Sequence, residues 1–72
     1  MNYYDDLVET AKPYFGFGAT LFVDRALRTI GQSKETVSKK DIPKLLSNID
    51  SVMGNSLKPE KKKRLREEIK EL

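Results

Sequence analysis

The sequence predicts an all-α fold, a small orthogonal bundle of three to four short helices. In four segments, about 2–12, 18–30, 42–53 and 59–72, apolar residues recur three and four positions apart, as on one face of a helix. Proline or glycine stands between these segments. No stretch alternates strictly between apolar and polar residues for more than a few positions, so a β-sheet is not expected.

The first segment, about 2–12, carries Leu7, Val8 and Ala11 at helical spacing. Asp5 and Asp6 lie in its first turn, where the helix dipole favours negative charge. Pro13 is expected to end this helix, because a residue that precedes proline is disfavoured in the α conformation.

The second segment, about 18–30, has one broad apolar face, made by Phe22, Val23, Ala26, Leu27 and Ile30. Asp24, Arg25 and Arg28 point away from that face. Gly31 is the expected left-handed stop, since glycine adopts positive φ without steric cost.

The third segment, 42–53, has two candidate caps. Ser38 and Asp41 have the spacing of a capping box, in which each side chain accepts from the other residue's backbone. Alternatively Asp41 is itself the cap, which puts Pro43 in the first turn, where its missing N–H costs nothing. The Asp41 cap is preferred, because a cap at Ser38 moves Pro43 into the second turn.

The fourth segment, 59–72, begins at a proline and carries pairs of opposite charge four positions apart. Its apolar stripe is thin, with only Leu65, Ile69 and Leu72 after Leu57. A helix with so little to bury is marginal in isolation. We expect 58–72 to be a semi-independent basic helix that either packs against the other three or orders against a partner.

Seventy-two residues predict a single domain, 1–72, and a chain without cysteine must stabilise it by helix packing or association. The predicted core is Leu7, Phe15, Phe22, Ala26, Ile30, Ile42, Leu46, Ile49 and Met53. The Gly16-Phe17-Gly18 segment is expected to be a tight turn rather than an anion-binding loop, with Tyr14, Phe15 and Phe17 filling the core.

Composition argues against catalysis. The chain has no histidine, cysteine or tryptophan, so the serines lack a histidine base and no thiolate is present. The acids Asp5, Asp6 and Glu9 lack the spacing of an EF-hand loop. We therefore expect no enzymatic activity, no cofactor and no metal site. Because its most apolar stretch, 14–23, is too short to span a bilayer and no signal peptide is visible, a cytoplasmic protein without membrane contact is expected.

Charge is concentrated near the end of the chain. Residues 1–57 hold seven basic and seven acidic side chains, whereas residues 58–72 hold seven basic and four acidic ones. The whole net charge of +3 therefore lies in the last fifteen positions. The candidate phosphate-contacting residues are Lys61, Lys62, Lys63, Arg64 and Arg66. The candidate apolar interface comprises Tyr3, Leu21, Leu57, Leu65, Ile69 and Leu72.

Residues 11–54 resemble small helical modules appended to bacterial signalling and regulatory chains. The likeness rests on the turn from Lys12-Pro13-Tyr14 through Gly18, on Asp24-Arg25, and on Val37-Ser38 followed by Asp41-Ile42-Pro43. It implies a prokaryotic interaction or regulatory module. Residues 26–42, ALRTIGQSKETVSKKDI, also resemble the histone fold around the end of its central helix and the start of its last helix, which implies DNA binding.

From these observations we expect a non-catalytic protein–protein interaction or regulatory module, with a second copy of the chain as one partner. The alternative is a small basic nucleic-acid-binding protein that uses its C-terminal helix.

Overall fold

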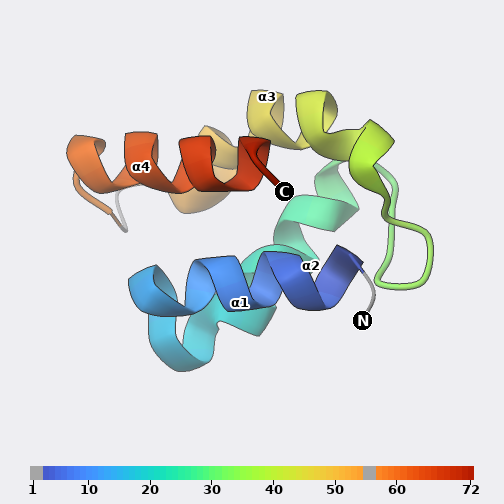
Figure 1. The fold of residues 1–72 in the computed structure, drawn as a ribbon, viewed down its shortest axis with the longest axis horizontal. Helices are drawn as coiled ribbons and strands as arrows, with labels where there is room; N and C mark the ends of the chain where they lie inside the picture. Colours follow the sequence, from blue (N-terminus) through green and yellow to red (C-terminus); the bar gives the residue numbers. More distant parts are fainter. Residues whose placement is uncertain (1–2, 55–56) are drawn as a thin grey trace.

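The computed structural model describes residues 3–54 and 57–72 of the chain. In these ranges it has four α-helices and no strand, which confirms the predicted all-α bundle (Figure 1). The helices are α1 (Tyr3–Phe15), α2 (Ala19–Thr29), α3 (Ile42–Met53) and α4 (Pro59–Lys70). Two 3₁₀ turns precede helices: η1 (Gly16–Gly18) before α2 and η2 (Lys39–Asp41) before α3. None of the described helices is long and apolar enough to cross a membrane.

The four helices pack in a closed ring. α1 packs on α2, α2 on α3, α3 on α4, and α4 returns to α1. In Figure 1, α1 and α4 lie side by side across the view, although they stand at opposite ends of the sequence. Because each helix contacts two others, the core lies at the centre of the ring and every helix contributes to it.

Among the described residues, fourteen apolar side chains are buried: Leu7, Ala11, Ala19, Phe22, Val23, Ala26, Leu27, Val37, Ile42, Leu45, Ile49, Met53, Leu65 and Ile69. They include six of the nine predicted core residues. The other three, Phe15, Ile30 and Leu46, are only partly buried against this cluster. The periodicity of the helices therefore identified most of the core, while Leu65 and Ile69 of α4 were not among the predicted core residues.

The first helix continues past the predicted stop at Pro13. α1 includes Pro13 and ends at Phe15, whose ring stacks on that of Phe22 with centroids 4.4 Å apart. Proline disturbs the helical ladder at its own position, but it stands only two residues before the end of α1, and the aromatic contact stabilises the turn that follows. Gly16, with a φ of 58°, is the residue at which the helical path ends.

The second helix ends as expected at Gly31, where φ is 73°. The Gln32 N–H donates to the Leu27 carbonyl at 2.9 Å, and the Gly31 N–H donates to the Arg28 carbonyl at 3.2 Å. These two bonds form a Schellman motif, which satisfies carbonyls that a helix end leaves open.

The start of α3 combines the two candidate caps: Asp41 is the N-cap residue of α3, as preferred, but its side chain caps no N–H of that helix. The Asp41 carboxylate turns back and accepts from the Ser38 N–H at 2.9 Å, so Ser38 and Asp41 form the capping box. Pro43 lies in the first turn of α3, because the turn η2 stands between Ser38 and the start of that helix. Asp41 is buried and also accepts from Gln32 Nε2 at 3.2 Å, which ties this cap to the end of α2.

Candidate functional site

The basic residues 61–64 of α4 do not form one face. Successive helical residues are about 100° apart, so four consecutive side chains point in four directions around the axis. Lys61, Lys63 and Arg64 are exposed, and Lys62 is partly buried. Three acids of the same helix, Glu60, Glu67 and Glu68, are also exposed, so the surface of α4 has mixed charge.

Arg66, the fifth candidate for phosphate contact, is used inside the protein. Its Nη1 donates to the Leu46 carbonyl at 2.7 Å and lies 3.3 Å from Asp50 Oδ2. Both partners belong to α3, so this guanidinium joins α4 to α3. Nη1 is committed to α3, while the side chain keeps 37% exposure, so contact of Arg66 with phosphate stays a prediction.

The candidate apolar interface divides into three groups. Leu65 is fully buried and Ile69 is 2% exposed, so both belong to the core and not to the surface. α4 buries them because it closes the ring between α3 and α1. Tyr3, Leu57 and Leu72 pack against the core and are half-buried. Leu21 alone of the six is largely exposed, at 56%.

Phe17 contradicts its predicted place in the core. Its side chain is fully exposed. The aromatic residue of this turn that packs against the core is Phe15, whose ring stacks on that of Phe22. Phe17 stands four positions before Leu21 and opposite the face that carries Phe22 and Val23. Helical geometry extended one turn upstream of α2 would have found it, since residues four apart share a face.

Four residues form what we call the outer stripe: Phe17, Leu21, Arg25 and Arg28. They are spaced four, four and three positions apart, so they lie along the solvent side of η1 and α2. All four are exposed. Neither Arg25 nor Arg28 makes a hydrogen bond or ion pair with any residue that the structure describes. The outer stripe is therefore apolar at one end and carries at the other two guanidinium groups that pair with none of the described residues.

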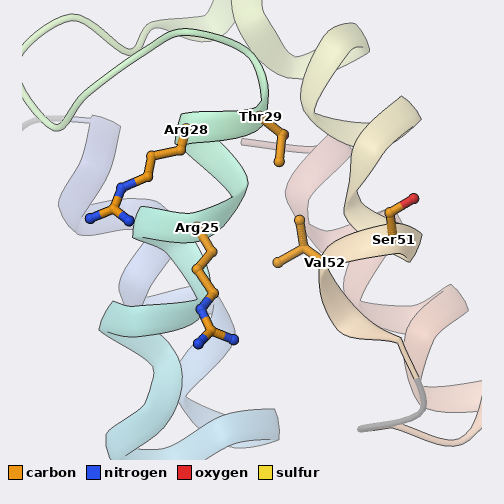
Figure 2. A pocket seen from close by; sticks show the side chains of 5 residues that line it. All are labelled: Arg25, Arg28, Thr29, Ser51 and Val52. Carbon is orange, nitrogen blue, oxygen red and sulfur yellow. The ribbon is translucent and has the colours of Figure 1, made fainter.

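A shallow hollow of about 390 Å³ adjoins the arginines, between α2 and α3 (Figure 2). Its lining residues are Arg25, Arg28, Thr29, Ser51 and Val52. Figure 2 shows Thr29 and Val52 on facing helices, the Arg25 side chain running along α2, and the Arg28 guanidinium pointing away from α3. The Thr29 hydroxyl donates to the Ala26 carbonyl at 2.6 Å, so it is engaged by its own helix. The remaining polar groups suit the binding of an anionic group.

The shifted pKa values lie elsewhere, on tyrosines at helix contacts. Burial raises the pKa of Tyr3 and of Tyr4, and Tyr4 also donates to Asp24 Oδ1 at 2.9 Å. Burial and a hydrogen bond to the Glu68 carboxylate raise the pKa of Tyr14 to about 12. All three phenols keep their protons at neutral pH. Among the described residues, no group of three or more acids is gathered as a metal site.

Comparisons with protein-family models, curated proteins and solved structures give no match to this chain. The resemblance of residues 11–54 to bacterial signalling modules, and that of residues 26–42 to the histone fold, stay predictions from the sequence.

Proposed function

We propose that this chain is a non-catalytic protein-interaction module that binds its partner through Phe17 and Leu21. The observation that carries the proposal is the complete exposure of Phe17 beside the exposed Leu21. They are the large apolar side chains that stand exposed in the described part of the chain. Removing an exposed aromatic ring from water is favourable, so a partner that covers Phe17 gains this free energy. Adjoining apolar residues on a surface mark interaction sites.

The local backbone supports this proposal. Gly16 adopts a φ of 58°, which turns the chain sharply after α1, and Phe17 follows immediately. Phe15 is packed on Phe22, so the two neighbouring aromatics lie on opposite sides of the turn. A turn already formed in the free chain lowers the entropy lost when its aromatic residue binds a partner. A regulatory role in the cytoplasm, expected from the sequence, belongs to the same proposal.

A selection from displayed peptides tests the proposal. The full chain would be used to select binders from a library of random 16-residue peptides, with the Phe17→Ala/Leu21→Ala variant as counter-selection. We expect binders that lose at least about tenfold in affinity with the double variant, because both anchors are removed. Thr20→Ala, a neighbouring exposed position outside the outer stripe, is the matched control and is expected to bind normally. Equal binding by the double variant and wild type would disprove the proposal.

The partner that binds Phe17 and Leu21 can be a second copy of the chain, and a dilution series tests this case. If Phe17 and Leu21 contact a second copy, the solution mass will rise with concentration for the wild type. The Phe17→Ala/Leu21→Ala variant will then stay monomeric under the same conditions. A dimer that persists in the double variant would place the self-contact on another surface and contradict this assignment.

Nucleic-acid binding through α4 is the second candidate function. It is favoured by the exposed Lys61 and Lys63 and by the concentration of net charge in residues 58–72. A titration with a generic DNA duplex at low and high salt separates the two functions, since phosphate contacts weaken steeply with salt. Salt-sensitive binding that Lys61→Glu/Lys63→Glu abolishes would support this candidate. Absence of binding at low salt would remove it.

A further inference from the structure

Resting on the proposed function, we infer that the outer stripe binds an acidic amphipathic helix of another protein, because Phe17 and Leu21 lie in line with Arg25 and Arg28, which pair with no described residue. The partner segment carries two apolar residues one turn apart, followed along the same face by two carboxylates. The apolar pair covers Phe17 and Leu21, and the carboxylates meet the two guanidinium groups.

Charge complementarity selects an acidic partner. The nearest acid on α2, Asp24, accepts a hydrogen bond from Tyr4, and neither arginine forms an ion pair with a described residue. A guanidinium presents two parallel donors that match the two oxygens of a carboxylate. The hollow of about 390 Å³ gives a partner's carboxylate room beside Arg25 on the α3 side, and the Arg28 guanidinium extends to the other side of α2, where it is exposed (Figure 2). Partial loss of water around these pairs strengthens them.

The spacing of the outer stripe favours a helical partner over an extended one. Eleven positions separate Phe17 from Arg28, which corresponds to about 16 Å along a helix. A facing helix has the same pitch of about 5.4 Å and presents one side chain to each stripe residue in turn. An extended strand presents same-side residues about 6.6 Å apart, so it falls out of step within the length of the stripe.

A second copy of the chain fits this surface poorly. Two outer stripes packed parallel bring arginine against arginine, and two packed antiparallel bring Phe17 against Arg28 and Leu21 against Arg25. Neither arrangement gives the arginines a carboxylate. Two apolar side chains cover at most about 400 Å², below the roughly 800 Å² that each partner buries in a stable complex of standard size. The geometry therefore points to a short segment held with modest affinity.

The peptide selection described above tests this inference when its products are sequenced and measured. We expect the selected 16-residue peptides to be enriched in aspartate and glutamate at helical spacing from an apolar pair. Arg25→Glu/Arg28→Glu is expected to weaken them by about tenfold or more. The decisive measurement is a charge swap, in which a selected peptide with its acids replaced by lysine binds the Arg25→Glu/Arg28→Glu variant and not the wild type. Circular dichroism of the peptide on binding will report its helix.

The outcomes separate the two levels of the proposal. Peptides that need Phe17 and Leu21 but lack acids, or ignore Arg25→Glu/Arg28→Glu, would overturn this inference and leave the proposed function intact. Peptides indifferent to Phe17→Ala/Leu21→Ala would overturn both. A selection without binders would overturn the acidic-helix inference, and a solution mass that doubles through Phe17 and Leu21 would then assign the surface to a second copy.

Discussion

Arg66 of α4 reaches across to α3 and donates from Nη1 to the backbone carbonyl of Leu46 at 2.7 Å. The same nitrogen lies 3.3 Å from the carboxylate of Asp50 one turn further along α3. This side chain therefore joins α4 to α3 through polar contacts. In the sequence it is one of several neighbouring basic residues, 61–66, and nothing there distinguishes its role.

We expect Arg66→Ala to lower the free energy of unfolding by about 1–2 kcal/mol, because it removes a charged donor from an interhelical hydrogen bond. Lys63→Ala is the matched control, since Lys63 is exposed on the same helix and makes no hydrogen bond or ion pair with a described residue. Its effect should stay within about 0.5 kcal/mol. Urea denaturation of both variants gives the comparison. Equal stabilities would show that the contact with Leu46 contributes nothing.

The burial of Leu65 predicts that α4 unfolds together with the rest of the chain. Leu65 is fully buried, and truncation of such a leucine to alanine costs about 2–5 kcal/mol. A domain of this length has a total stability of only about 4–11 kcal/mol. Leu65→Ala should therefore lower the melting transition of all four helices, as followed by circular dichroism.

Amide exchange in the wild type provides the independent check on α4. If the helix belongs to one cooperative unit, the amides near Leu65 and Ile69 exchange as slowly as those near Leu45 and Ile49 of α3. Fast exchange confined to α4 would instead identify it as the semi-independent helix that its thin apolar stripe predicts. In that case Leu65→Ala would remove the helicity of α4 and leave the melting transition of α1, α2 and α3 unchanged.

Sequence alone located α3 to the residue and most of the core, because those features depend on local signals. The segment 42–53 is bounded by a capping pair and a glycine, and its apolar period is unbroken. Gly31 was equally predictable, since positive φ after a helix is a local requirement.

The candidate surface was less predictable, because it depends on contacts between distant residues. Phe15 and Phe17 are two aromatics in one turn, and the sequence does not say which one meets Phe22. The same holds for α4, where burial of Leu65 follows from the space that α1 and α3 leave open. Likewise Arg66 finds its carbonyl twenty residues away, a separation that no local motif encodes.

The contact of Tyr14 with Glu68 predicts a stability loss in strong alkali. The pKa of Tyr14 is raised from 10.0 to about 12 by burial first, then by its hydrogen bond to the Glu68 carboxylate and by the charge of that carboxylate. A raised pKa means that the folded state binds the phenolic proton more tightly than the unfolded state. This contribution to stability is complete below pH 10 and is lost as the pH rises to about 12.

Tyrosinate absorbance measured against pH checks this assignment. Because the pKa values of Tyr3 and Tyr4 are raised as well, the signal of Tyr14 is obtained as the difference between wild type and Tyr14→Phe. Glu68→Gln removes the negative charge and should lower the pKa of Tyr14 only part of the way from about 12 toward 10, because burial, the largest cause, is unchanged. An unchanged titration in Glu68→Gln would contradict the role given to Glu68.

The turn before α2 offers a matched pair of glycine substitutions. Gly16 has a φ of 58°, a conformation that costs an L-residue about 1–2 kcal/mol, so Gly16→Ala is expected to destabilise the chain by that amount. Gly18 has a φ of −79°, and a Cβ there meets only Phe15 Cβ at 3.9 Å, an ordinary contact. Gly18→Ala should therefore be neutral, or should stabilise by up to about 1 kcal/mol through the unfolded state.

The same pair links the turn to the proposed interaction. Relief of the strain in Gly16→Ala shifts the turn that carries Phe17, so peptide binding should weaken together with stability, while Gly18→Ala keeps both. Urea denaturation and peptide affinity measured on the two variants give four values to compare. If Gly16→Ala loses stability but binds peptide as tightly as wild type, the turn is needed for folding alone and does not position Phe17.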